Sequence, residues 1–134
     1  MSWVEIFAVF VVSHAAGDYL LQTDWQATNK HGGLTGPPEA RRALFSHVFT
    51  YTLAFVPAGA WLAAKMSPLG LLALAGGIFV PHLIQDDARL LTSYIKRVKG
   101  IGAATTPTVF TPVDQSFHLI TLFATALVVH AGIA

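Results

Sequence analysis

Residues 3–21 read WVEIFAVFVVSHAAGDYLL, a run in which Glu5, His14 and Asp18 interrupt an otherwise largely apolar sequence. A helix needs about 20 mainly apolar residues to cross a bilayer, so this run predicts a membrane span. An ionisable side chain inside a span costs free energy and is rare. The pair of His14 and Asp18, four residues apart, therefore needs an explanation.

The composition also favours a membrane protein. Of 134 residues, 54% are hydrophobic and 11% are charged, and the mean hydropathy is +0.58. Soluble globular domains have about 25% charged residues. The net charge of +1 gives no reason to expect nucleic acid as a partner. The sequence contains no cysteine, which excludes disulfides and thiolate metal ligands.

Three further apolar runs are long enough to cross a bilayer as helices. The very short connection at residues 65–67 predicts an antiparallel hairpin of the second and third helices. We expect one domain, residues 1–134, folded as an all-α, up-and-down four-helix transmembrane bundle. The expected spans are about 3–21, 43–64, 68–91 and 112–133.

Capping signals and prolines mark the expected helices. Ser67 and Thr111 each place a hydroxyl before a proline, which is favoured at the first helical position. Asp114 follows Thr111 by three residues and can complete a capping box. Pro57 and Pro81 lie inside the second and third spans, where each removes a backbone hydrogen bond and should bend its helix.

The basic residues predict the orientation in the membrane. Seven of the eight Lys and Arg residues lie in or beside the first and third connections, and only Lys65 lies in the second. Positively charged loops stay in the cytoplasm. Connections one and three should therefore be cytoplasmic, and both chain termini should lie on the non-cytoplasmic side.

Histidine and aspartate recur at one helical spacing in three of the spans. Residues four apart lie on one face of a helix, and random placement would give roughly half of one such His/Asp pair. All three pairs, and His47 on the second span, are expected in the cytoplasmic half of the bundle. The pairs are His14 with Asp18, His82 with Asp86, and Asp114 with His118.

These side chains are suited to bind a metal between the helices. Intramembrane ionisable residues usually face the bundle interior. Imidazole suits Zn and Fe, and carboxylate extends the choice to Mn. We predict one or two divalent ions (Zn, Mn or Fe), held by ligands drawn from His14, Asp18, His47, His82, Asp86, Asp114 and His118.

Simpler interpretations exist for each element. A single buried His and Asp pair is more often a hydrogen bond between helices, because buried polar groups need partners. Asp114 taken alone fits the capping box better than a ligand, and His130 lies near the opposite end of its span. Asp24 and Lys30 could contact a polar substrate or water, and Asp87 could be a spare ligand or an interfacial charge. Recurrence at one depth favours metal binding over these readings.

The first pair and the residues after it resemble a known family. The pattern His14-x-x-x-Asp18-Tyr-Leu-Leu-Gln22-Thr-Asp24-Trp-x-Ala, followed by Lys30 and His47, is similar to domain of unknown function 3307. The pairs His82-x-x-x-Asp86 and Asp114-x-x-x-His118 extend the resemblance over most of the chain. It implies a small bacterial or phage integral membrane protein, here expected in the bacterial inner membrane, and implies no activity. A distant analogy links the pattern to membrane-bound metal-dependent hydrolases.

Several functions fit this pattern. The leading one is a metal-dependent hydrolase that acts on a lipid or amphiphilic phosphoester at the cytoplasmic interface, with Asp18, Asp86 and Asp114 as catalytic carboxylates.

Three alternatives remain. Metal or proton transport would need polar residues along the whole path, but the outer halves of the spans are nearly all apolar. A haem-binding bundle would use two axial histidines. In a structural membrane subunit the polar residues would form only a hydrogen-bonded network. Membrane lipids are the expected partners, and the chain could form a homo-oligomer.

Overall fold

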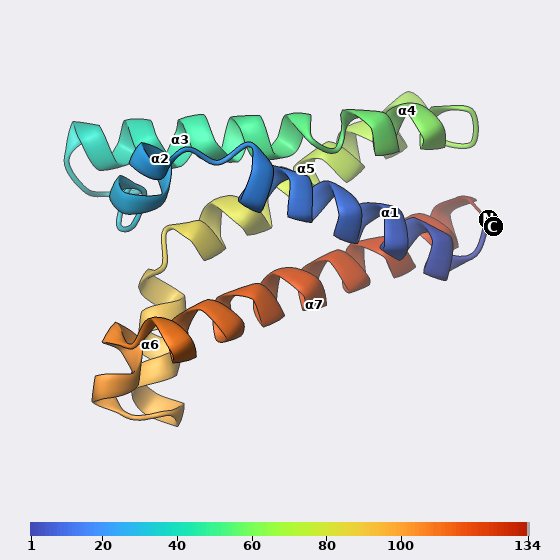
Figure 1. The fold of residues 1–134 in the computed structure, drawn as a ribbon. Helices are drawn as coiled ribbons and strands as arrows, with labels where there is room; N and C mark the ends of the chain where they lie inside the picture. Colours follow the sequence, from blue (N-terminus) through green and yellow to red (C-terminus); the bar gives the residue numbers. More distant parts are fainter. Residues whose placement is uncertain (134) are drawn as a thin grey trace.

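The computed structural model describes residues 1–133, and these residues form helices joined by turns, without a strand. Four helical stretches are long and apolar enough to cross a membrane: Trp3–Leu20, Pro38–Ala63, Pro68–Asp86 and Pro107–Gly132. The start of the first and the end of the last lie together at one end of the molecule (Figure 1). The prediction of an all-α chain with four candidate membrane spans is confirmed.

Residues 1–133 form nine helical segments. α7 packs against α1 and α5, and α5 also packs against α3 and α4. The segments among the described residues are α1 (Trp3–Ala15), the π-helix η1 (Ala16–Leu20), α2 (Asp24–Asn29), α3 (Pro38–Leu53), α4 (Val56–Ala63), α5 (Pro68–Asp86), α6 (Arg89–Val98), the 3-10 helix η2 (Ile101–Thr105) and α7 (Pro107–Ile133).

The buried interior is divided into an apolar and a polar part. Ile6, Phe10, Leu62 and Ala126 belong to an apolar core to which α1, α4 and α7 contribute. The start of α1, the end of α4 and the end of α7 lie in the half of the bundle that contains the chain termini (Figure 1). Outside, large apolar side chains such as Leu72 are exposed. So much exposed apolar surface suits contact with lipid rather than water.

The second span begins earlier than expected. α3 starts at Pro38 rather than at residue 43, because Glu39, Arg41 and Arg42 are good helix formers that extend the helix beyond its apolar part. The helix is then interrupted between α3 and α4. Pro57 lies in the first turn of α4, where its missing N–H removes no helical hydrogen bond.

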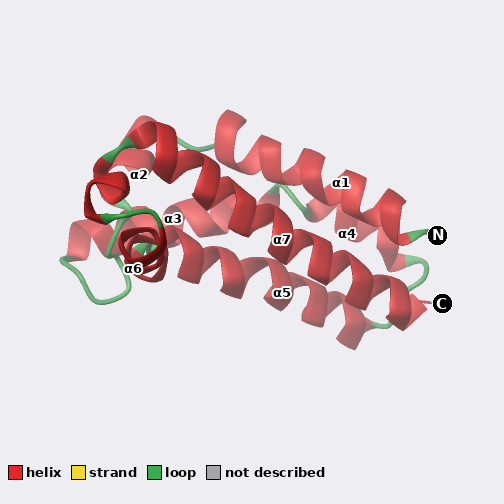
Figure 2. Cartoon of the chain, turned by 90° about the horizontal axis from the view of Figure 1, so that it is seen from below, coloured by secondary structure: helices red, strands yellow, loops and turns green. Residues whose placement is uncertain are grey.

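The third span ends earlier than expected, at Asp86 rather than at residue 91. Ala88 has a left-handed backbone conformation, with φ of 63°, which ends α5 and redirects the chain. The apolar residues Leu90 and Leu91 belong to α6, a separate amphipathic helix that continues with Lys96 and Arg97. Figure 2 shows α6 end-on, whereas α5 and α7 run lengthwise across the picture, so α6 crosses the end of the bundle.

The fourth span begins at Pro107 rather than at residue 112. The segment TPTVFTP contains Thr-Pro twice, and the helix starts at the first proline and continues through Pro112. Asp114 therefore lies inside α7, so the capping-box interpretation of Asp114 is wrong. The Asp114 side chain therefore does not cap the helix and can contact other residues inside the bundle.

Connections one and three contain short helices of their own, whereas connection two does not. Connection two is short as expected, and the Ser67 hydroxyl caps α5 by accepting from Gly70 N at 3.1 Å. Connection one contains the short helix α2, which starts with a capping box of Thr23 and Gln26. Connection three contains α6 and η2.

Candidate metal centre

Four side chains from three elements converge on one point. Nε2 of His47 on α3 lies 2.8 Å from Asp86 Oδ2 and 3.4 Å from Asp18 Oδ1. Nε2 of His82 on α5 lies 3.2 and 3.5 Å from the same two oxygens. The two imidazole nitrogens are 3.0 Å apart. Ligands about 2.0–2.1 Å from a tetrahedral ion lie about 3.3–3.4 Å from one another, so these spacings fit one metal ion.

A second group shares Asp86 with the first. Asp86, Asp114 and His118 bring ligand atoms within 4.8 Å of one another. His118 Nε2 lies 3.5 Å from Asp86 Oδ1, while Asp86 Oδ2 faces His47 and His82. Asp86 therefore presents one oxygen to each group. This arrangement suits a carboxylate that joins two neighbouring cation sites.

His118 is oriented as a metal ligand usually is. Its Nδ1 lies 2.9 Å from the Asp114 backbone carbonyl oxygen, so Nδ1 carries the proton and donates it. Nε2 then keeps its lone pair. Ligating histidines commonly donate their second nitrogen in this way. Nε2 of His118 is buried and has no hydrogen-bond partner among the described residues.

Asp18 enters the cluster from a π-helical turn. Leu21 N donates to the Ala16 carbonyl oxygen at 2.9 Å, the i to i+5 bond of a π-helix. Such turns occur frequently at functional sites. Oδ1 of Asp18 is buried and has no hydrogen-bond partner among the described residues. A buried carboxylate oxygen without a donor is costly unless a cation is bound.

His14 is the predicted ligand that the structure places outside both groups. Its Nδ1 lies 3.1 Å from the Tyr51 hydroxyl, and its Nε2 lies 2.9 Å from Gln115 Oε1. Gln115 Nε2 in turn donates toward Asp18 Oδ2 at 3.4 Å. His14 therefore helps to position Asp18, and both of its nitrogens have partners other than a metal.

The whole of this arrangement lies within a region that matches a known protein family. The model of the family described as "Protein of unknown function (DUF3307)" matches residues 6–133. The chain belongs to this family. No curated protein and no solved structure matched it. The predicted resemblance to DUF3307 is confirmed.

Lys30 of this DUF3307 protein reaches the cluster from connection one. Its ammonium lies 2.7 Å from Asp86 Oδ2, and only 8% of the residue is exposed. Backbone contacts hold the segment in place, because Gly32 N donates to the Asp87 carbonyl oxygen and Leu34 N donates to Asp87 Oδ1, each at 2.8 Å. Asp87 thus anchors a loop and is directed away from the metal groups.

The cluster has an excess of negative charge when its histidines are neutral, the state in which they bind a metal. With neutral histidines and ionised carboxylates, Asp18, Asp86 and Asp114 contribute three negative charges, and the Lys30 ammonium, which contacts Asp86, contributes one positive charge. Two formal negative charges remain. Uncompensated charge in a low-dielectric interior is expensive. A bound divalent cation would neutralise these two negative charges.

Tyr51 is a further site residue that sequence reasoning missed. Its ring stacks on the His82 imidazole with ring centroids 3.3 Å apart and planes 4° apart. The ring has room only because Gly17 has no side chain, since a Cβ at Gly17 would lie 2.5 Å from Tyr51 Cδ2. The only sequence signal was that Tyr51 lies one helical step after His47.

Other predicted positions lie outside the cluster. His130 Nδ1 contacts the Met1 carbonyl oxygen at 3.0 Å, at the far end of the bundle. Asp24 is exposed at the start of α2. Gln115 was also missed, although it follows Asp114 directly.

Gly17→Ala is expected to destabilise the protein by roughly 1–3 kcal/mol, the usual range for overpacking, because the new methyl group displaces Tyr51 from His82. Thermal unfolding in detergent measures this. Gly76→Ala is the matched control, since a Cβ at Gly76 meets nothing within 4 Å and alanine favours a helix. Equal melting temperatures for Gly17→Ala and the wild type would contradict the packing argument.

Lys30→Met is expected to tighten divalent metal binding by at least about tenfold, which corresponds to about 1.4 kcal/mol. The ammonium lies at the oxygen that a metal in the first group would share, and like charges about 4 Å apart repel by several kcal/mol at an effective dielectric near 20. Competition against a chromophoric chelator measures the affinity. Lys65→Met in connection two is the control. Weaker binding in Lys30→Met would show instead that Lys30 positions Asp86.

Proposed function

We propose that this chain is a membrane-embedded metal-dependent hydrolase that acts on a lipid or another amphiphilic phosphoester at the cytoplasmic interface. The observation that carries the proposal is the convergence of Asp18, His47, His82 and Asp86 at distances that fit one ion. Zn, Mn and Fe are the metals that suit imidazole with carboxylate. Asp114 and His118 would complete a second site through Asp86.

The position of the cluster supports the cytoplasmic side. Asp86 ends α5, and Asp114 and His118 lie near the start of α7. These two helix ends lie at the side of the bundle that carries α2 and α6, opposite the chain termini (Figure 1). Seven of the eight Lys and Arg residues belong to the segments at that end, and basic loops remain cytoplasmic. The proposal therefore includes a single up-and-down domain in the bacterial inner membrane with both termini on the non-cytoplasmic side.

In the proposed hydrolysis, the residues of the cluster have different roles: some would hold the metal and one would accept a proton. A bound divalent ion would polarise a phosphoryl oxygen and activate water. In hydrolysis, the oxygen of water bonds to phosphorus, the bond from phosphorus to the leaving oxygen breaks, and a proton passes to that oxygen. Asp18 and Asp86 would hold the ion. Asp114, whose side chain is 18% exposed, is the carboxylate accessible enough to take a proton from water.

Transport and haem binding fit the observations less well. Among the described residues, the interior of the half near the termini is the apolar core that contains Phe10 and Leu122, so no polar path crosses the bundle. Two axial imidazoles on one iron need nitrogens about 4 Å apart, so the pair His47 and His82, with Nε2 atoms 3.0 Å apart, does not fit axial ligation, and haem does not call for the three aspartates of the cluster.

The test is hydrolysis by the purified protein in vesicles that contain an alkyl phosphoester. The wild type should release the product only when Zn²⁺, Mn²⁺ or Fe²⁺ is supplied, and Asp18→Asn with His82→Ala should lose activity by about a hundredfold or more. Lys65→Gln, at the other end of the bundle, should retain it. Chelator-insensitive activity, or equal activity in the ligand variant, would refute the metal-dependent mechanism. Metal binding without turnover would refute the hydrolase alone.

A further inference from the structure

An apolar pocket lies between α5, α6 and α7 at the end of the bundle that carries the metal groups. Its volume is about 290 Å³. Apolar side chains from all three helices form most of its wall: Ile84, Leu90, Leu91, Tyr94 and Phe117. Tyr94 and Phe117 meet edge to face with ring centroids 5.1 Å apart, which joins α6 to α7.

Asp114 connects this pocket to the candidate metal centre. It lines the pocket and also belongs to the second metal group with Asp86 and His118. The side chain of Asp114 is 18% exposed, whereas those of Asp18 and Asp86 are 5% and 2% exposed. Among the described carboxylates of the cluster, Asp114 is thus the one that a ligand can reach, and it is reached from the pocket.

We infer that this pocket binds the hydrocarbon chain of a single membrane amphiphile, and that the polar head of the amphiphile then lies at Asp114 beside the metal groups. The inference rests on the proposed function and names the substrate class: a phosphoester with a long hydrocarbon chain. The continuity of an apolar wall with a metal-ligating carboxylate carries it.

The walls of the pocket suit a hydrocarbon chain rather than a peptide. Gln85, the other polar residue of the lining, uses its amide on the Phe117 carbonyl oxygen at 3.2 Å and the Thr121 hydroxyl at 2.7 Å. A hydrocarbon chain requires no hydrogen bonds, whereas a peptide backbone inside a bilayer must have all of its hydrogen bonds satisfied.

α6 places the pocket at the level of the lipid head groups. It crosses the end of the bundle (Figure 2), and it exposes 70% of Leu90 together with basic residues Lys96 and Arg97. A helix with one apolar and one basic face lies in the membrane interface and attracts anionic lipid. Moving a chain from the bilayer into the pocket changes little apolar burial, so the pocket provides position and the head group provides affinity.

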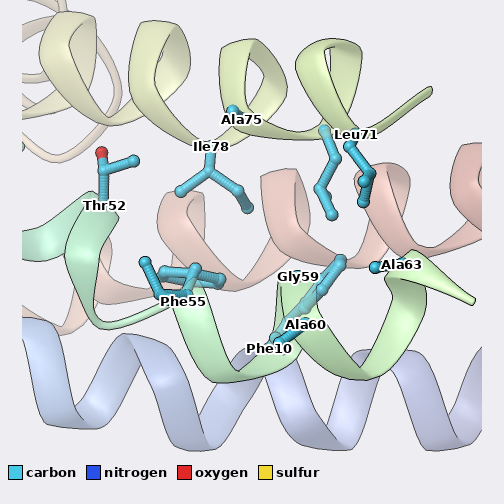
Figure 3. Close-up of a pocket in the computed structure, with 12 residues that line it drawn as sticks. Phe10, Thr52, Phe55, Gly59, Ala60, Ala63, Leu71, Ala75 and Ile78 are labelled. Carbon is cyan, nitrogen blue, oxygen red and sulfur yellow. The ribbon is translucent and has the colours of Figure 1, made fainter. Parts of the chain in front are cut away.

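A second pocket provides an internal comparison. The groove between α4 and α5 has a volume of about 380 Å³ and is lined by apolar residues such as Phe55, Ala60 and Ile78. Figure 3 shows these side chains facing the space between the two helices. No member of the metal groups lines this groove. A chain bound there would leave its head group away from the cluster.

The experiment uses photochemical labelling of the full chain in detergent. The probe is a long-chain alkyl phosphate with a diazirine at the end of its chain, and cross-linked residues are mapped by mass spectrometry. Metal content is measured on the same sample. We expect labels on residues 84–94 and 114–117 to exceed those on the α4–α5 groove about tenfold. Ile84→Phe should reduce the pocket labels about tenfold, and Ala60→Phe in the α4–α5 groove should not.

The outcomes separate this inference from the proposed function. Metal in the protein with labels spread evenly over the outer surface would overturn the pocket and leave the metal centre intact. Pocket labels in a protein that binds no metal would support the chain site and overturn the proposed hydrolase. If Ile84→Phe fails to fold, competition by unlabelled alkyl phosphate decides: loss of pocket labels supports the inference, and unchanged labels overturn it.

Discussion

Asp86→Asn is expected to weaken divalent metal binding by more than about a hundredfold, which exceeds the usual 10–100-fold effect of changing a residue that only supports a ligand. Asp86 offers one oxygen to His47 and His82 and the other to His118, so its loss affects both groups. Equilibrium competition against a chromophoric chelator, with Zn²⁺ and Mn²⁺ in turn, measures the change. Asp87→Asn is the matched control, because Asp87 anchors Leu34 and does not face the cluster.

The same substitution should also destabilise the fold by about 3–5 kcal/mol, because it leaves the Lys30 ammonium buried without its partner. The double variant Asp86→Asn with Lys30→Met removes both charges. It should recover most of the lost stability while metal binding remains lost. Wild-type metal affinity in the double variant would show that Asp86 is not a ligand.

Divalent metal is expected to raise the melting temperature of the detergent-purified protein by on the order of 10 °C. A ligand at a thousandfold excess over its dissociation constant stabilises the native state by about 4 kcal/mol. One kcal/mol corresponds to a few degrees for a chain of this size. The physical reason is that an ion would relieve the excess negative charge of Asp18, Asp86 and Asp114. Thermal unfolding with chelator and then with added Zn²⁺ measures the shift.

The Asp86→Asn with Lys30→Met variant serves as the control for this shift. Without Asp86 the two groups lose their shared ligand, so added metal should leave its melting temperature within about a degree of the chelated sample. The same rise in both proteins would indicate that the metal acts elsewhere, and no rise in the wild type would contradict a native-state metal centre.

The sequence predicted the main features of the fold because they depend on local composition. The four apolar runs are recognisable by length alone, and the Ser67-Pro68 signal marks the start of α5. The ends of the spans were less predictable. Whether Leu90 belongs to a span or to an interfacial helix depends on the left-handed conformation of Ala88. Alanine does not favour this conformation, so the sequence alone does not predict it.

The candidate site was predictable only in part. Spacing of four residues placed His82 and Asp86 on one face, and these two do converge with Asp18 and His47. The role of Lys30 depends on a Gly-rich loop that is tied to Asp87 by long-range hydrogen bonds. His14 satisfies the same spacing rule but is bonded to Tyr51 and Gln115, because spacing fixes the face of a helix and not the partner it meets.

Elemental analysis of the detergent-purified protein determines whether the cluster holds a divalent metal. The wild type, supplied with Zn, Mn or Fe and then dialysed against metal-free buffer, should retain about one ion per chain or more, because four ligands from the first group can hold one ion. Asp86→Ala with His118→Ala, purified in parallel, should retain essentially none. A wild-type protein that keeps no metal under any of these conditions would contradict the account.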